Sequence, residues 1–367
     1  MANVGAPSHV FVLIHGTFAR GAAWTGDESR LTQTLKDGFP SAIIRRFLWT
    51  GHNSHNARLL AGEQLRDELE TIARENPNAN LHLISHSHGG NVALYALRER
   101  GVGRQVASLV CISTPFIICT GRDAGKLYVR LGFALNAMFI TLVMLSCFYF
   151  GVRLGAVGQT MLAGNLVVLV GLQVAIRRFG PTILDRLRDK QEAIVDRLSL
   201  GRCTTIVLAA RVARDEAAFW LRSSYLLSRL PHLANLMGLL LLLGIGIPVI
   251  LSIFSLGPFA QMPVQTIYSN WLKAALVALA SFGLIVVATL ITRSHPFAFG
   301  WEGIFDGLLV DLNAGRAPNF RVVEHEFHIP RGFRLRHSAV YADERFIQFL
   351  PQWVQRVEQL TDLEAET

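Results

Sequence analysis

The chain has 367 residues, of which 51% are hydrophobic and 17% charged, and its net charge is +8. This length can form one large domain or two smaller ones, and the apolar content exceeds that of a typical soluble domain and indicates contact with lipid. Because no basic and aromatic motif accompanies the positive charge, an anionic membrane is favoured over nucleic acid, and we expect no nucleic-acid partner.

The cysteines and the N-terminal residues both indicate a reducing compartment. The four cysteines have neither metal-like nor disulfide-like spacing, and no cluster of His, Asp and Glu has the spacing of metal ligands. The first residues, MANVGAPSHVFVLIHG, lack the basic region, apolar stretch and cleavage site of a signal peptide. We therefore expect the globular part of the chain to face the cytoplasm, without a metal.

Two strands are predicted near the N-terminus. Residues 9–14 form an apolar run typical of a buried parallel strand, and the run ends in His15-Gly16-Thr17-Phe18. Residues 41–48 form the second strand, which the sequence WTGHNSHNAR and a predicted helix at residues 59–74 follow. In a parallel sheet the loops after both strands emerge at the carboxyl edge, where ligands bind.

The chain is organised around residues 80–99, NLHLISHSHGGNVALYALRE. A strand pattern stops at SHSHGG and a helical pattern begins at once, which predicts a strand, a sharp turn and a helix with Ser87 at the apex. Such a turn requires very small residues two positions before and after the serine, where Ser85 and Gly89 stand. The hydroxyl is then exposed at a helix N-terminus, where the N–H of His88 can bind an oxyanion.

This stretch resembles the nucleophile elbow of the α/β-hydrolase family, G-x-S-x-G, with Ser85 in place of the first glycine. The resemblance implies a doubly wound, mostly parallel α/β sheet and a serine hydrolase similar to lipases and esterases, with Ser87 as the nucleophile. It also implies that the His-Gly pair after the first strand forms the other half of the oxyanion hole. The backbone N–H of Thr17 is then the donor, with Phe18 as the second choice, and His15 is a structural residue that holds the loop.

The loop at residues 49–58 is similar to a W-x-G-x-N-S-x-x-x-R pattern of bacterial serine hydrolases. A binding role and a solvated loop that caps the next helix are equally compatible with its composition. The candidate substrate-binding residues are Phe18, Trp49, His52, Asn53 and Arg58.

A strand is predicted at residues 106–113, and the alternation of strands and helices then stops. Four uncharged runs follow, each long enough for a bilayer core of about 30 Å, which needs about 20 helical residues. The runs cover residues 131–152, 154–176, 233–256 and 274–292. They predict four transmembrane helices arranged as two inserted hydrophobic hairpins, with apolar lid hairpins that dip into one leaflet as the alternative.

Basic residues lie mainly on the outer sides of these hairpins, whereas the two tips contain only Arg153 and Lys273. The positive-inside rule then predicts a multi-pass protein of a bacterial inner membrane whose remaining parts face the cytoplasm. One hydrolase core would be assembled from three segments, residues 1–120, 181–230 and 295–367, with the hairpins at residues 121–180 and 231–294.

The candidate acid follows a strand predicted at residues 203–210. In the family the acid follows a late strand in this way, so the resemblance implies Asp215, with the adjacent Glu216 as the alternative. A pair of surface carboxylates at a helix start would also explain these residues. Asp306 and Asp311 are weaker candidates.

The candidate base lies near the C-terminus, between a strand predicted at residues 320–328 and an amphipathic helix predicted at residues 343–359. A histidine in the loop between the last strand and the last helix matches the base of the family, and His337 is in that place. For His325 and His328, which lie within the strand pattern, we expect structural roles.

These residues together predict acyl transfer. His337, oriented by Asp215, would accept the proton of Ser87 while the serine oxygen attacks a carbonyl, and water would release the acyl group. No cofactor is required, and the position at a membrane suggests a lipid-like ester or thioester. An acyltransferase with the same triad is the nearest alternative, followed by an inactive membrane scaffold and by a transporter subunit, which the scarcity of intramembrane ionisable residues disfavours. The oligomeric state stays open.

Overall fold

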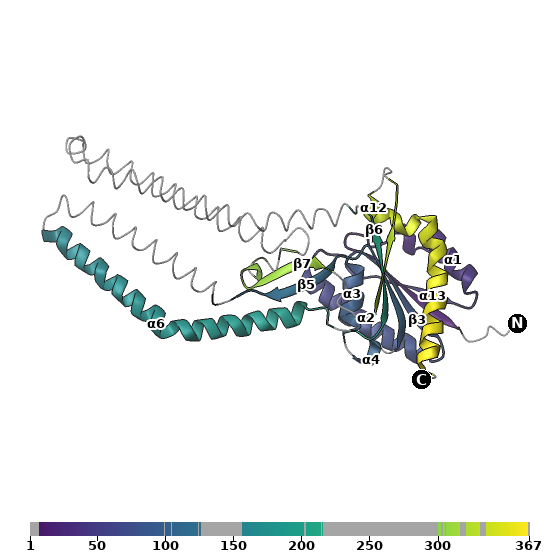
Figure 1. Cartoon of the computed structure of the whole chain (residues 1–367), viewed down its shortest axis with the longest axis horizontal. Coiled ribbons are helices and arrows are strands. Elements are labelled where there is room, and N and C mark those ends of the chain that lie inside the picture. The colour runs from purple at the N-terminus through teal and green to yellow at the C-terminus, as the bar shows by residue number, and fades with distance from the viewer. Residues whose placement is uncertain are drawn as a thin grey trace.

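The computed structural model of the chain describes residues 7–98, 100–103, 105–123, 125, 156–201, 203–213, 215, 300–301, 304, 306–315, 321–330 and 335–365. A parallel sheet of six strands forms its centre, in the order β2-β1-β3-β4-β6-β8 (Figure 1). The strands of this sheet are β1 (His9–Ile14), β2 (Ile43–Phe47), β3 (Asn80–His86), β4 (Val106–Ile112), β6 (Ile206–Val212) and β8 (Val322–Phe327).

Strict alternation along the strands gives the sheet two apolar faces. Val10 and Val12 of β1 point into one core, whereas Phe11 and Leu13 point into the other. Because successive side chains of a strand lie on opposite faces, an unbroken apolar run is what a strand covered on both sides requires. The run at residues 9–14 therefore forms a strand near the centre of the sheet, as predicted.

Helices cover both faces, which confirms the doubly wound α/β arrangement. Helices α2 and α3 pack on one core and α1 and α13 on the other (Figure 1). The helices are α1 (Arg30–Gly38), α2 (His55–Glu75), α3 (Gly89–Ala96), α4 (Arg100–Gly103), α6 (Ala156–Leu198), α12 (Arg336–Ala339) and α13 (Glu344–Ala365), with 3-10 turns at Ala23–Thr25, Asp306–Leu308 and Val340–Ala342.

Helix α2 begins four residues before the predicted start. Ser54 is its N-cap, because the serine hydroxyl accepts a hydrogen bond from the backbone N–H of Ala57 at 3.0 Å. The second half of the loop predicted at residues 49–58 is therefore helical.

A second sheet, absent from the sequence prediction, lies beside the first. Strands β5 (Phe116–Gly121) and β7 (Val310–Gly315) pair in antiparallel register. The guanidinium of Arg122 pairs there with the carboxylate of Asp311, and Arg197 donates to Asp306 at 3.2 Å. The two weaker candidates for the triad acid are thus engaged in ion pairs at this second sheet.

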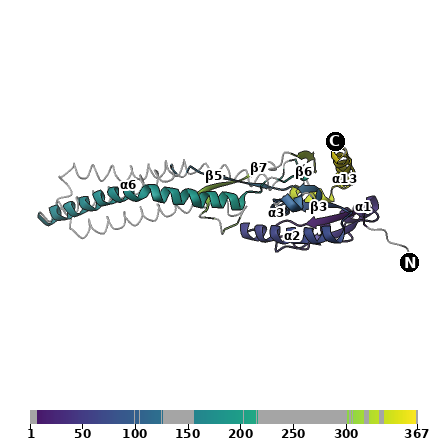
Figure 2. The same cartoon turned by 90° about the horizontal axis from the view of Figure 1, so that it is seen from below.

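Helix α6 extends away from the central sheet (Figures 1 and 2). It joins two stretches that the sequence separates, most of the uncharged run at residues 154–176 and the charged stretch at residues 185–198. Pro181 lies inside the helix, where proline removes a backbone donor and favours a bend, and α6 is bent in Figure 1. The amide of Gln191 anchors its near end by donating to the carbonyl oxygen of Leu309 at 2.6 Å.

The predicted membrane spans fall largely outside this description. Residues 131–152, 233–256 and 274–292 lie outside the described residues. Where the chain is described, α6 included, none of the helices combines the length and the apolar character needed to cross a bilayer. The structure therefore gives no support to a membrane span at residues 154–176, most of which lies in α6, whereas the three other runs stay a prediction.

Candidate active site

The turn between β3 and α3 has the geometry of a nucleophile elbow. Ser87 lies between the end of β3 and the start of α3 with a backbone φ of 53°. A positive φ is costly for a residue with a side chain and is retained mainly where the surrounding structure enforces it. Here the backbone N–H of Ser87 donates to the carbonyl oxygen of Ile112, at 2.8 Å, which ties the apex to the end of β4.

Small residues on either side of Ser87 permit this turn. A Cβ atom on Gly89 would lie 2.6 Å from the carbonyl oxygen of His15, so any larger residue would push α3 away from β1. Ser85, which replaces the usual glycine, is fully buried and donates its hydroxyl to the carbonyl oxygen of Val110 at 2.9 Å. Its polar group is thus satisfied, which explains why serine is accepted there.

The structure brings the predicted base and acid together. Nδ1 of His337 lies 2.9 Å and 3.1 Å from the two carboxylate oxygens of Asp215. Asp215 stands three residues after β6, and His337 belongs to the short helix α12. A carboxylate at Nδ1 holds the proton on that nitrogen and leaves Nε2 as the acceptor for a further proton. The alternative acid, Glu216, lies outside the described residues.

His86, the residue before the candidate nucleophile, holds the segment that contains the candidate base. Its Nε2 lies 3.0 Å from the backbone carbonyl oxygen of His337, and the centroids of the two rings are 5.0 Å apart. Burial lowers the pKa of His86 to about 4, and the positive charge of protonated His337 acts in the same direction. His86 is therefore neutral near pH 7 and donates from Nε2 to the carbonyl.

Two aromatic residues pack around His86. Tyr341 meets the His86 ring edge to face at a centroid distance of 5.1 Å, and Trp24 stacks on Tyr341 at 5.5 Å. The sequence analysis assigned no role to Trp24, Tyr341 or His86. Only His86 had a local signal, its place next to Ser87.

The turn after β1 packs directly on the elbow. A Cβ atom on Gly16 would lie 2.9 Å from Cβ of Ser87 and 3.0 Å from the carbonyl oxygen of His86. The backbone N–H of Phe18 donates to the carbonyl oxygen of Gly51 at 2.8 Å, so Phe18 is not available as the oxyanion donor. Thr17 therefore stays the candidate on this side, opposite His88 at the start of α3.

His15 is a structural residue, as expected. Its Nδ1 lies 2.8 Å from the carbonyl oxygen of Gly16, and its Nε2 lies 3.2 Å from that of Trp49. In return, the indole N–H of Trp49 donates to the carbonyl oxygen of His15 at 2.8 Å, and the two rings stack. Burial lowers the pKa of His15, whereas its contacts with the carbonyl oxygens of Gly16 and Trp49 raise it. The ring fixes the two loops relative to each other.

The candidate substrate-binding residues divide into two groups. Phe18 is 83% exposed and His52 is also exposed, whereas Trp49 is 2% exposed and Arg58 is completely buried. Arg58 donates to the side-chain oxygen of Asn53 at 3.1 Å. Trp49 and Arg58 are therefore internal supports of the loop, which corrects the expectation that their side chains face the substrate, and Asn53 is half-buried between the two groups.

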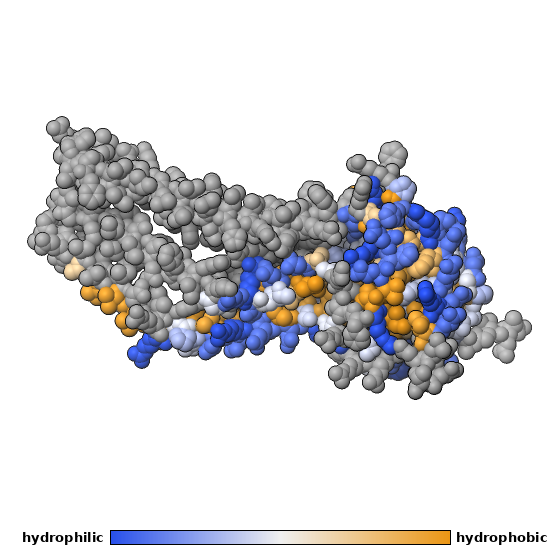
Figure 3. Space-filling view, viewed as in Figure 1, coloured by the Kyte–Doolittle hydropathy of each residue, from blue (hydrophilic) through white to orange (hydrophobic). Residues whose placement is uncertain are grey.

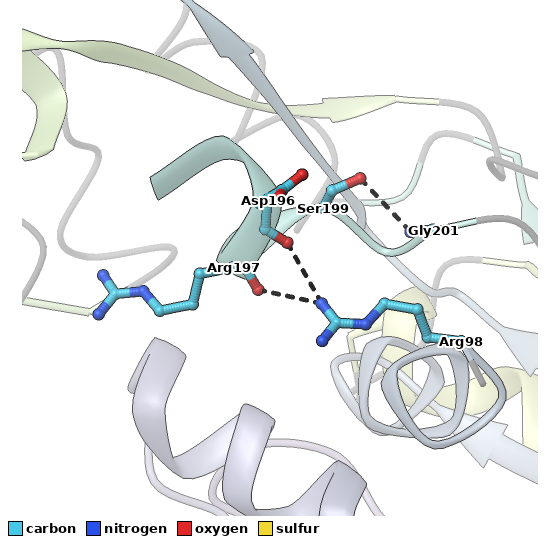
Figure 4. A pocket seen from close by; sticks show the side chains of 5 residues that line it. All are labelled: Arg98, Asp196, Arg197, Ser199 and Gly201. Carbon is cyan, nitrogen blue, oxygen red and sulfur yellow. Dashed lines mark hydrogen bonds between the residues drawn. The ribbon is translucent and has the colours of Figure 1, made fainter. Parts of the chain in front are cut away.

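A surface pocket lies elsewhere, at the opposite end of α3 from Ser87. Its volume is about 430 Å³, and it is lined by Arg98, Asp196, Arg197, Ser199 and Gly201 (Figure 4). The guanidinium of Arg98 donates to the backbone carbonyl oxygens of Asp196 and Arg197, at 3.2 Å and 3.5 Å (Figure 4). These contacts join α3 to the end of α6, and none of them involves a predicted site residue.

The other candidate histidines differ in their surroundings. His325 stacks on Phe349 with a centroid distance of 4.7 Å, which agrees with the structural role expected for it. His328 lies one residue beyond β8, is 78% exposed and is 3.9 Å from Glu326, so the structure gives no support to a structural role for it.

The chain matches the model of the alpha/beta hydrolase family over residues 11–289. No curated protein matches it. Similar solved structures include a cutinase-like protein from Cryptococcus sp., with 17% identity, a TM-score of 0.25 and coverage of 30% of this chain and 56% of that one. A cutinase from Trichoderma reesei has 14% identity, a TM-score of 0.27 and coverage of 30% and 53%. The acetyl xylan esterase catalytic core of the same organism has 14% identity, a TM-score of 0.27 and coverage of 31% and 66%, so the chain spans about half to two thirds of these proteins.

Proposed function

Because the chain belongs to the α/β-hydrolase family, we propose that it is a serine esterase whose triad consists of Ser87, His337 and Asp215. The observation that carries this proposal is the hydrogen bond between His337 and Asp215, at 2.9 Å, in a segment that His86 ties to the elbow. The three residues come from separate parts of the chain, and the pair of His337 and Asp215 contacts His86, the residue next to the strained Ser87.

In the proposed reaction Ser87 attacks the carbonyl carbon of an ester while His337 accepts the hydroxyl proton at Nε2. Asp215 stabilises the imidazolium that forms. The N–H groups of Thr17 and His88 donate to the oxyanion, and His337 returns the proton to the leaving alcohol. Water, activated by the same histidine, then attacks the acyl-enzyme, which releases the acid and restores Ser87.

The substrate we propose is a lipid-like ester or thioester with a long acyl chain. One support is Phe18, a large apolar side chain that is exposed on the turn that packs against Ser87. Another is the apolar surface on the outer part of α6 (Figure 3). The exposed apolar residues of this helix are Val167, Val170, Val174, Phe179 and Ile183. Exposed apolar side chains on one helix suit contact with lipid.

The same proposal places the protein in a bacterial inner membrane with its catalytic part in the cytoplasm. The uncharged runs at residues 131–152, 233–256 and 274–292 and their basic flanks support this location. Extraction of membranes with alkaline carbonate, which removes peripheral proteins, is the test. The protein should stay in the pellet, and its release into the supernatant would remove membrane integration from the proposal.

Labelling with a fluorophosphonate probe tests the triad. Wild-type protein should react, whereas Ser87→Ala should lose all labelling and His337→Ala nearly all of it. Ser85→Gly, which restores the glycine of the family motif two residues away, is the matched control and should label like the wild type. Labelling that persists in Ser87→Ala would contradict the assignment of the nucleophile.

Hydrolysis of nitrophenyl esters of increasing acyl length tests the substrate class. The proposal predicts that kcat/KM increases from acetyl to long-chain esters, and an optimum at acetyl would contradict it. Addition of alcohol acceptors to the same assay tests the acyltransferase alternative, because a transferase would form a new ester and release little free acid.

A further inference from the structure

A second cluster of chemically active side chains lies at the opposite edge of the central sheet from Ser87. It consists of His9 at the start of β1, His82 near the start of β3 and Glu358 on α13. One potential ligand atom of each residue lies within 4.8 Å of those of the other two. Figure 1 shows α13 running across the sheet toward this edge. His82 precedes Ser87 by five residues, or about 16 Å of strand, so the cluster is separate from the triad.

The buried member of the cluster is His82, and within the described residues only one of its two ring nitrogens has a hydrogen-bond partner. Its Nδ1 lies 2.9 Å from the hydroxyl of Ser108 on β4. Its Nε2 is buried, and within the described part of the chain this nitrogen has no hydrogen-bond partner. The same Nε2 is aimed at Oε1 of Glu358, 3.7 Å away. An unsatisfied buried nitrogen is unusual and calls for an explanation, such as an ion that it binds.

His9 repeats this arrangement. Its Nδ1 lies 2.7 Å from the hydroxyl of Ser8, and its Nε2 lies 2.6 Å from Oε1 of Glu358. Both imidazoles therefore have a serine hydroxyl at Nδ1 and the same carboxylate at Nε2. In metal sites the non-ligating nitrogen of a histidine is held in this way, which keeps the proton on Nδ1 and the lone pair on Nε2.

We propose that His9, His82 and Glu358 bind one divalent transition-metal ion, with Zn²⁺ as the ion that their chemistry fits best. Two neutral imidazoles and one carboxylate are usual zinc ligands, and a water molecule would complete a tetrahedral site. The side chains of His9 and Glu358 are 13% and 24% exposed, so water can reach the fourth position.

Binding requires a modest adjustment of the two contacts with Glu358, and the nitrogens of His9 and His82, which lie within 4.8 Å of each other, would approach by up to about 1.5 Å. Bonds of about 2.0–2.2 Å in a tetrahedral site place ligand atoms roughly 3.3 Å apart. The contact between His9 and Glu358 would lengthen and that between His82 and Glu358 would shorten, each by less than about 1 Å. The proton shared by His9 and Glu358 would leave to solvent as the metal takes its place.

The ion would join the first strand, the elbow strand and the last helix. Such a site stabilises the folded state because the unfolded chain does not bring its ligands together. The three ligands lie far apart in the chain, which explains why short-range metal motifs gave no signal. This inference does not depend on hydrolysis and would hold for an inactive protein of the same fold.

Zinc binding to the purified full-length protein, stripped with a chelator and then titrated with ZnCl₂, tests the proposal. Wild type should bind one Zn²⁺ per chain at this site and gain several degrees in Tm. His9→Gln and Glu358→Gln should weaken binding at least 100-fold and lose the gain in Tm. Ser108→Ala, which removes only the partner of His82 Nδ1, should weaken binding about 10- to 100-fold.

The matched control is His328→Gln, which removes an exposed histidine far from the cluster and should bind zinc like the wild type. Circular dichroism of each variant without zinc establishes that it folds, so that lost binding reports on the ligands. Four-coordinate Co²⁺ absorption in the wild type, absent from Glu358→Gln, would identify the same site. Failure of the wild type to bind zinc below about 100 µM, or unchanged binding in His9→Gln and Glu358→Gln, would overturn the proposal. The three side chains would then only join β1, β3 and α13 by hydrogen bonds.

Discussion

The imidazole Nε2 of His86 donates to the backbone carbonyl oxygen of His337 at 3.0 Å, so the residue before the proposed nucleophile positions the backbone of the proposed base. The two residues are joined across 251 positions of sequence. Because His86 is the last residue of β3, this contact fixes the position of α12 relative to the central sheet.

Replacing His86 should therefore reduce turnover without a matching loss of substrate binding. His86→Phe keeps a ring in the buried space but removes the donor, and we expect kcat to fall about 10- to 100-fold because a small displacement of His337 misaligns proton transfer. His86→Gln, which retains an N–H donor, should recover part of the loss. A fall in thermal stability with unchanged kcat, in measurements of both parameters, would indicate a role in packing alone.

Gly16→Ala should impair catalysis while the fold persists. The added methyl would lie 2.9 Å from Cβ of Ser87 and would force the oxyanion turn and the elbow apart. Loss of alignment of one oxyanion donor costs on the order of 10²-fold in kcat. Gly101→Ala is the control, because its added Cβ has no atom within 4 Å. Equal rates for the two variants would contradict the close approach of the turns.

Asp215→Asn should lower kcat by on the order of 10³- to 10⁴-fold, because an amide cannot hold the Nδ1 proton of His337 as a carboxylate does. The KM should change little. Glu216→Gln is the adjacent control and should keep nearly full activity in the same steady-state assay. If Glu216→Gln were the inactive variant, the assignment of the acid would move by one residue.

The stability of the fold should decrease in mild acid because His55 is buried in its neutral form. Burial, followed by the charges of Arg58 and Arg197, lowers the pKa of His55 to about 3, whereas an exposed histidine has a pKa near 6.5. Between these values the unfolded chain binds the extra proton, so the free energy of unfolding falls as the pH drops below 6.5. The loss from this group is about 2–3 kcal/mol between pH 7 and pH 4.5.

Urea titrations at several pH values measure this effect. His86, with its pKa lowered to about 4, acts in the same direction. In His55→Asn the curve of stability against pH should be flatter than in the wild type. Identical slopes for the two proteins would show that His55 does not remain neutral in the folded state.

The sequence was most informative where function and fold are encoded locally. The strand at residues 9–14 was predicted with the bounds of β1, because an apolar run between turn residues leaves few alternatives. The turn at Ser87 was predicted from the small residues Ser85 and Gly89, since the steric requirement acts within four positions. The placement of His337 beside Asp215 followed only from the order of elements in the family.

Features that depend on distant residues were not predicted. Strand β5 pairs with β7, almost 200 residues later, and no pattern in either segment indicates its partner. Arg58 was expected to face the substrate because of its place in the loop after the second strand, but it is completely buried and donates to the side chain of Asn53. The cluster of His9, His82 and Glu358 is likewise formed only by the folded chain.

The division of the proposed triad among the ends of β3 and β6 and the short helix α12 also orders the maturation of the protein during synthesis. A nascent chain that has emerged as far as β4 already contains Ser87, but Asp215 and His337 are still to be translated. The long sequence separations in the finished sheet delay its closure, because distant contacts form slowly. A ribosome-bound or truncated chain would therefore carry an elbow without a base, and reactivity would begin only when the last strand and helix have joined the sheet.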